Sequence, residues 1–290
     1  MIHDSPAVRP LPVLEKEDLS MIRLIALDLD DTLLGPDLTV SPACCSVLQE
    51  AVTRGIKVTF ASGRMYRSVQ PYAEKLRLGT IPLITYNGAL VRFAGYGKTI
   101  FHRPLEIEPA RELILSFREA GLHINVFLND ELFMEKLDEE GKRYIERSRV
   151  KVNLVKDLSA VLLSGPTKIL GCGPPEDISK LQKQMARKYR GRIFFTRSRP
   201  RFLECLAPGV NKGLALAKVA GFFGVAAHEV MAVGDAPNDL EMLKWAGIGV
   251  AMGNSPPEVQ KAADWTAPPN HRDGVAAAFR RYILVEDYCH

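Results

Sequence analysis

Short apolar runs alternate with longer amphipathic stretches along most of the chain. Residues 22–27 are continuously apolar apart from Arg23, which is typical of a strand buried on both faces of a parallel sheet. Similar runs predict further strands at 57–61, 81–86, 230–233 and 248–251. Helical patterns separate them at 42–54, 68–76 and 239–245. Strands that alternate with helices indicate an α/β fold with a parallel sheet.

The middle of the chain, residues 89–204, has a different rhythm. Helices are expected at 109–120, 138–148 and 176–189, and strands at 123–128, 131–135, 167–172 and 193–196. This stretch is long enough to bury a core of its own. We therefore expect a second, α+β domain there.

The composition is that of an ordinary globular protein, with 47% apolar residues, 25% charged residues and a net charge of +4. These values exclude a disordered chain and give no reason to predict nucleic-acid binding. The longest unbroken apolar run, Val219 to Ala227, is much shorter than the roughly 20 residues that cross a bilayer, so we expect no membrane span. Five cysteines without C-x-x-C spacing predict reduced thiols in a cytoplasmic protein. Residues 1–20 lack the apolar segment of a secretory signal, and we expect a loose N-terminal extension there.

Carboxylates follow two of the predicted strands directly. Asp28 and Asp30 come after the first strand, and their spacing places them on one side of it. Asp235, Asn238 and Asp239 follow the strand at 230–233. Because ligands of parallel sheets bind beyond the carboxyl ends of the strands, both groups are expected to share one crevice. Such a cluster suits a hard divalent cation such as Mg²⁺, although either group alone has an ordinary interpretation as loop and helix-capping acids.

Two further features point to an anion beside these acids. Ser62 and Gly63 lie between the strand at 57–61 and a helix start, where a hydroxyl and backbone N–H groups make an anion site. Lys212 opens an apolar helix. By itself it is best interpreted as a solvated lysine, but together with the other groups it is a candidate phosphate ligand.

The combined pattern resembles the haloacid dehalogenase-like hydrolase superfamily and, within it, the Cof-type phosphatases. The resemblance covers nearly the whole chain after Met21. It implies a Rossmann-like parallel-sheet core, residues 21–88 and 205–290, with an inserted α+β cap domain, residues 89–204. One departure is Asp31, which stands where this family usually has glycine. The matching motifs are DLDDTL (28–33), FASGR (60–64), YNGA (86–89), GVNKG (209–213), GDAPNDLEML (234–243) and GVAMGNSPPEV (249–259).

The resemblance also implies roles for single residues. Asp28 is expected to be the nucleophile that forms an aspartyl-phosphate, and Asp30 the general acid and base. The Asp28 side chain, the Asp30 carbonyl and Asp235 are expected to hold Mg²⁺. The expected phosphoryl ligands are Ser62, Gly63, Lys212 and Asn238, with Asp239 in support.

These roles imply a Mg²⁺-dependent phosphatase that hydrolyses small phosphorylated metabolites such as sugar phosphates, FMN or pyridoxal phosphate. A hexose phosphomutase on the same core is the alternative, and a non-catalytic protein that binds phosphorylated ligands ranks third. No nucleic acid or membrane partner is expected, and the chain is expected to be a monomer or a weak homodimer.

Charge is divided unevenly between the two predicted domains. Residues 89–204 contain 22 basic and 15 acidic residues, a net of +7, and the rest of the chain has a net of −3. Nine basic residues and no acid lie between Ile178 and Leu203. A solvated helix face is the favoured interpretation. The second is that some of these residues line the cap and attract an anionic substrate. Nucleic-acid binding ranks third, because no aromatic stacking pattern is interleaved there.

Overall fold

The computed structural model describes residues 22–284, and the predicted N-terminal extension lies outside this range. Five parallel strands form a central sheet in the order β14-β13-β12-β1-β2. The prediction of an α/β fold with a parallel sheet is confirmed. In sequence order these strands are β1 (Leu24–Leu27), β2 (Lys57–Phe60), β12 (Val230–Gly234), β13 (Ile248–Met252) and β14 (Trp265–Ala267).

Helices cover both faces of this sheet, as the alternation of side chains along β1 requires. Leu24 and Ala26 pack into a cluster with α7 and α8, whereas Ile25 and Leu27 pack into another with α2 and α10. Ser41 begins α2, because its hydroxyl accepts a hydrogen bond from the Cys44 amide at 3.1 Å. The helices are α2 (Pro42–Thr53), α3 (Tyr66–Lys75), α7 (Lys212–Phe223), α8 (Leu240–Trp245), α9 (Pro257–Ala262) and α10 (Gly274–Tyr282).

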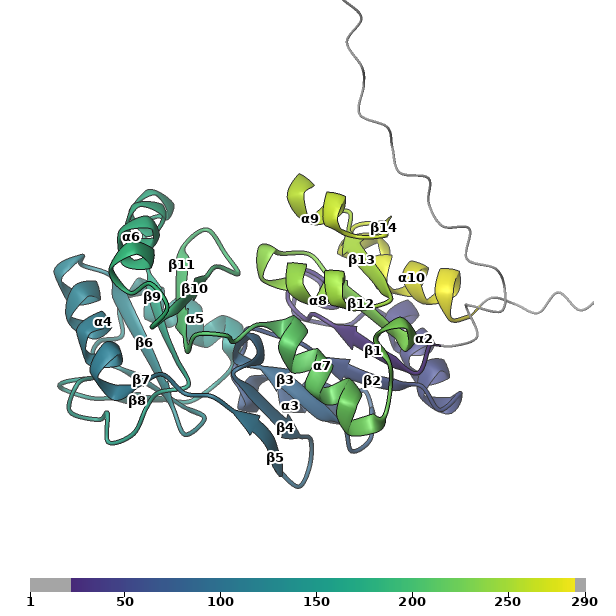
Figure 1. The fold of residues 1–290 in the computed structure, drawn as a ribbon, viewed down its shortest axis with the longest axis horizontal. Helices are drawn as coiled ribbons and strands as arrows, with labels where there is room; N and C mark the ends of the chain where they lie inside the picture. The colour runs from purple at the N-terminus through teal and green to yellow at the C-terminus, as the bar shows by residue number, and fades with distance from the viewer. Residues whose placement is uncertain (1–21, 285–290) are drawn as a thin grey trace, which may run out of the picture.

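A second, six-stranded sheet in the order β10-β11-β9-β6-β7-β8 is built from the middle of the chain. Its pairs are antiparallel except β7 with β8. Figure 1 shows α4 and α6 on the side of this sheet away from the central sheet, and α5 on the nearer side. The elements are α4 (Ile107–Glu119), β6 (His123–Leu128), β7 (Glu131–Met134), α5 (Glu139–Ser148), β8 (Val152–Leu154), β9 (Lys168–Cys172), α6 (Pro175–Lys188), β10 (Phe194–Thr196) and β11 (Phe202–Leu206).

A small antiparallel sheet, β3-β4-β5, lies where the two larger parts meet (Figure 1). Because β4 pairs with β3 and β5 pairs with β4, this sheet crosses the predicted boundary at residue 88, and the division into core and cap stays a prediction. Its strands are β3 (Pro82–Thr85), β4 (Leu90–Phe93) and β5 (Thr99–His102), and short 3-10 turns are η1 (Tyr86–Gly88), η2 (Ala227–Glu229), η3 (Pro237–Asp239) and η4 (Asn270–Arg272).

The elements expected from apolar periodicity begin and end within two residues of their predicted positions. The unpredicted elements include β4, β5, β8, β14 and α9, which are too short to show a period, and β11 and α10. Across residues 22–284, no helix combines the length and the apolar character that a bilayer span demands.

Candidate active site

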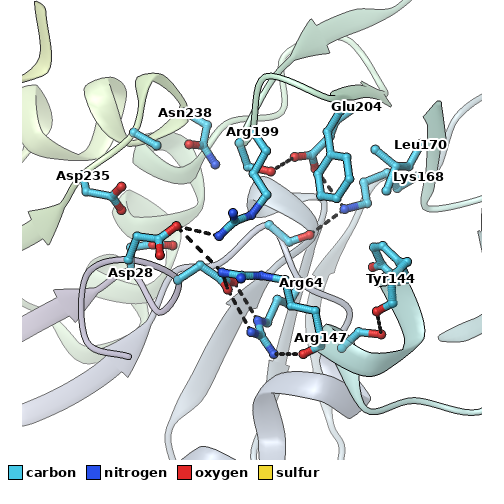
Figure 2. A pocket seen from close by; sticks show the side chains of 17 residues that line it. Asp28, Arg64, Tyr144, Arg147, Lys168, Leu170, Arg199, Glu204, Asp235 and Asn238 are labelled. Carbon is cyan, nitrogen blue, oxygen red and sulfur yellow. Dashed lines mark hydrogen bonds and ion pairs between the residues drawn. The ribbon is translucent and has the colours of Figure 1, made fainter. Parts of the chain in front are cut away.

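The carboxyl ends of β1, β2 and β12 bring the predicted site residues together. Because these strands are parallel neighbours, Asp28 and Asp235 leave the sheet at the same edge. The pocket at this edge is lined by Asp28, Asp30, Gly63, Asp235 and Asn238 (Figure 2). Residues of the stretch 89–204, called the middle segment from here on, complete the lining. The shared crevice predicted from the strand ends is therefore present.

Lys212 is fully buried at the start of α7 and lies between Asp28 and Asp239. Its Nζ is 2.6 Å from Asp28 Oδ1 and 2.5 Å from Asp239 Oδ1. Burial alone would lower the pKa of Lys212, but Asp239 and Asp28 hold it above its usual value. Lys212 is thus a fixed cation inside the site, and the interpretation as a solvated lysine is wrong.

Asp28, Asp235 and Asp239 place carboxylate oxygens within 4.8 Å of one another. Burial, with the charges of neighbouring acids, raises the pKa of Asp28 well above its usual value and the pKa of Asp235 to about 7. One lysine does not balance three acids, and this excess of negative charge fits a hard divalent cation.

The hydrogen bonds distinguish these three acids. Both oxygens of Asp239 already accept bonds, Oδ1 from Lys212 and Oδ2 from the amides of Asp235 and Ala236. Asp235 Oδ1 accepts from the Thr32 hydroxyl at 2.8 Å. Within residues 22–284, the second oxygens of Asp28 and Asp235 accept no hydrogen bond, so these two acids fit a metal best and Asp239 supports the cluster.

The Asp30 carboxylate turns away from the acid cluster and binds two arginines. Arg64 donates to both of its oxygens, at 2.7 and 2.8 Å, and Arg147 Nη2 donates to Oδ1 at 2.7 Å. Although burial opposes the effect, these hydrogen bonds and charges hold the pKa of Asp30 well below its usual range. Because both carboxylate oxygens are occupied, the main-chain carbonyl of Asp30 stays the group of this residue that we expect to bind a metal.

Ser62 and Gly63 lie at the end of β2, but the first amides of α3 do not serve as their anion site. Asp130, in the turn between β6 and β7, accepts from the amides of Tyr66 and Arg67 at 3.0 and 3.1 Å. Ser62 is buried, and its hydroxyl accepts from the Arg64 amide. Gly63 itself lines the pocket.

A buried polar network joins this site to the middle segment. Asn238 Nδ2 donates to Asn87 Oδ1, and Asn87 Nδ2 donates to Glu204 Oε2, each at 2.8 Å. Lys168 Nζ donates to the same Glu204 oxygen at 2.9 Å and to the Gly63 carbonyl at 2.6 Å (Figure 2). The network therefore fixes the position of Asn238 and Gly63 relative to β9 and β11.

We expect Glu204→Gln to destabilise the protein by about 3 kcal/mol, because it leaves the charge of Lys168 buried without an opposite charge. The two side chains are 1% and 3% exposed, so water cannot replace the lost carboxylate. Urea unfolding measures the difference. The matched control is the double variant Lys168→Met/Glu204→Gln, which should recover most of the loss. A loss below about 1 kcal/mol in the single variant would show that the pair is not needed.

Lys168, Glu204, Tyr144, Arg147 and Arg199 were not predicted from the sequence, although all line the pocket. The basic residues of α6 are exposed, as the favoured interpretation predicted, but the side chain of Arg199 reaches the pocket.

The fold and the site define a hydrolase with an acidic crevice at the edge of a parallel sheet. The sequence model of the haloacid dehalogenase-like hydrolases matches residues 25–279, and the chain belongs to this family. It is a phosphatase, in agreement with the sequence prediction.

Relatives of known sequence or structure cover most of the chain. The 5-amino-6-(5-phospho-D-ribitylamino)uracil phosphatase YitU of Bacillus subtilis is 32% identical, over 90% of this chain and 98% of that protein. The HMP-PP phosphatase of Serratia proteamaculans is 37% identical, over 83% and 87%. A haloacid dehalogenase-like hydrolase from Bacteroides thetaiotaomicron has a similar structure, with 30% identity, a TM-score of 0.82 and coverage of 90% and 99%.

Proposed function

We propose that this phosphatase uses Mg²⁺ and hydrolyses small phosphomonoesters through an aspartyl-phosphate on Asp28. The observation that carries the proposal is the position of the Asp28 carboxylate. It is buried at the end of β1, lies 2.6 Å from Lys212, and borders the same pocket as Asp30 and Asp235. A carboxylate held there can attack a phosphoryl group whose charge Lys212 helps to neutralise.

In the first step an Asp28 oxygen forms a bond to phosphorus while the bond to the leaving oxygen breaks. Asp30 supplies the proton that the leaving oxygen needs. It can carry this proton only once the bound substrate breaks the contacts of its carboxylate with Arg64 and Arg147, because those contacts favour the charged form. In the second step Asp30 takes a proton from water, and that water oxygen displaces Asp28 from phosphorus. Inorganic phosphate leaves, and both carboxylates return to their starting states.

Each remaining predicted residue has a part in this proposal. A Mg²⁺ ion held by Asp28, Asp235 and the Asp30 carbonyl would supply charge neutralisation and orient the phosphoryl group. Ser62, Gly63, Lys212 and Asn238 would bind its oxygens, with Asp239 in support through its contact with Lys212. Residues 21–88 and 205–290 would act as the core and 89–204 as a cap that excludes water. The cytoplasmic location and the monomer or weak homodimer stay predictions from the sequence.

Metal removal tests the proposal. After treatment with a chelator, we expect hydrolysis of p-nitrophenyl phosphate to fall at least about a hundredfold and to return on addition of Mg²⁺, because the cation contributes several kcal/mol to the transition state. A panel of sugar phosphates, FMN and pyridoxal phosphate then compares the substrate candidates. Full turnover in chelator would contradict the role of the metal. Isomerisation of a hexose 1-phosphate faster than phosphate release would instead identify the phosphomutase.

A further inference from the structure

Two arginines of the middle segment line the pocket on the side of the acidic loop that carries Asp30 and Asp31 (Figure 2). Arg147 Nη2 lies 2.7 Å from Asp30 Oδ1 and 3.8 Å from Asp31 Oδ2. Arg199 Nη2 lies 2.5 Å from Asp31 Oδ2. Both arginine side chains keep about a third of their surface exposed, at 32% and 30%, so the pocket remains open to them.

The elements that carry these arginines are anchored, so the main chain at both positions is held beside the pocket. Arg147 lies in the last turn of α5, whose end is fixed because the Ser68 hydroxyl donates to the Ser148 carbonyl at 2.7 Å. Arg199 lies in the turn between β10 and β11, where the neighbouring Ser198 hydroxyl donates to Glu204.

Asp31 adopts a backbone conformation that favours glycine, with φ of 59°. Its carbonyl accepts a hydrogen bond from Asn254 Nδ2 at 2.8 Å, and its carboxylate contacts Arg199. The departure from the usual glycine thus adds an anion at the place where Arg199 enters the pocket.

Residues 89–204 also give the pocket an apolar wall. Tyr144, Leu170 and Phe202 line it, and the rings of Tyr144 and Phe202 lie 6.3 Å apart between centroids. A flat apolar group can pack against this wall while charged groups bind the arginines.

The position of Asp30 connects these features to the reaction. An acid that gives its proton to the leaving oxygen must come within hydrogen-bond reach of that oxygen. Because Arg147 already contacts Asp30, substituents close to the leaving oxygen must meet Arg147 and then Arg199. In this structure Arg147 and Arg199 bind the carboxylates of Asp30 and Asp31, which shows that each guanidinium is placed to bind an oxyanion.

We propose that Arg147 and Arg199 form an anion subsite for the leaving group, so that the preferred substrates carry a second oxyanion two or three bonds from the leaving oxygen. The proposal rests on the proposed phosphatase function and specifies its substrate class. The oxyanion belongs either to a second phosphoryl group, as in a diphosphate, or to a carboxylate on the adjacent carbon. Charge-assisted hydrogen bonds from a guanidinium suit both.

Three substrates with the same benzyl group test the subsite: benzyl phosphate, benzyl diphosphate and O-phosphomandelate. The Mg²⁺-loaded full chain should hydrolyse at least one of the two doubly anionic compounds with a kcat/KM roughly 10- to 100-fold above that of benzyl phosphate, as expected for one or two charged hydrogen bonds. Whichever compound is preferred identifies the source of the oxyanion. In Arg199→Gln and Arg147→Gln the preference should fall to about threefold or less.

Arg143→Gln is the matched control, because Arg143 lies on the same helix, is exposed and pairs with Glu140. This variant should keep the preference of the unmodified protein. Benzyl phosphate turnover with no preference for either anionic compound would overturn the subsite while leaving the phosphatase function intact, and so would a preference that persists in both glutamine variants. Absence of Mg²⁺-dependent turnover on all three compounds would instead contradict the proposed function.

Discussion

Replacing Asp28 by asparagine is expected to lower phosphatase turnover by a factor on the order of 10⁴ or more, as losses of a covalent nucleophile do in other enzymes. The amide keeps the size of the side chain but has no carboxylate oxygen to attack phosphorus. It also leaves Lys212 paired with Asp239 alone. Steady-state release of phosphate from p-nitrophenyl phosphate with saturating Mg²⁺ measures the loss.

The same variant should fold at least as stably as the unmodified protein in the absence of metal. Burial and the neighbouring acids raise the pKa of Asp28, which means that its charged form is disfavoured in the folded site. A neutral isostere removes that repulsion, so the melting temperature should stay equal or rise. Asp37→Asn, in an exposed loop, is the matched control and should retain full activity. Retention of more than a tenth of the activity by Asp28→Asn would contradict the nucleophile assignment.

The acidic crevice could be predicted because the carboxyl ends of parallel strands lie at the same edge of a sheet. Once 22–27 and 230–233 are recognised as parallel neighbours, Asp28 and Asp235 must leave the sheet at the same edge. No equivalent rule predicts which carboxylate oxygen of each acid accepts no hydrogen bond and can therefore bind a metal. The distinction between Asp235 and Asp239 depends on backbone amides that turn toward Asp239 only in the folded loop.

The buried pair of Lys168 and Glu204 did leave a signal in the sequence. Each is the single charged residue of a short apolar strand, in KILGC and FLECL. Because a charge on a fully buried strand requires a partner, two such strands predict that their charged residues pair with each other. That inference needs the two strands to be neighbours, and β11 does pair with β9.

The contacts of Arg147 and Arg199 could not be predicted in this way. They join residues 117 and 168 positions apart in the chain, and they depend on how the six-stranded sheet docks beside the acidic loop. A basic stretch in the sequence looks the same whether it lies on a helix exposed to water or in a turn that enters a pocket. In this protein the basic residues of α6 are exposed to water, whereas Arg199 lies in a turn and lines the pocket.

Replacing Asp30 by asparagine is expected to lower the turnover of an alkyl phosphate by about 10²- to 10⁴-fold, the usual contribution of a positioned acid and base. Asparagine can still accept a hydrogen bond from Arg64 or Arg147, but it neither protonates the leaving oxygen nor takes a proton from water. The loss of the Asp30 carboxyl group therefore affects both proposed steps. Phosphate release from benzyl phosphate under saturating Mg²⁺ measures the combined effect.

With p-nitrophenyl phosphate the two steps can be separated, because the nitrophenolate leaves with little need for a proton. Asp30→Asn should then form the aspartyl-phosphate quickly and hydrolyse it slowly, which gives a burst of nitrophenol close to one equivalent of enzyme. The residual steady-state rate reports the second step alone, where water lacks its base. An unchanged steady-state rate on benzyl phosphate would show that another group moves the protons. A large loss without a burst would show that Asp30 is needed to position Asp28 and the phosphoryl group rather than to transfer protons.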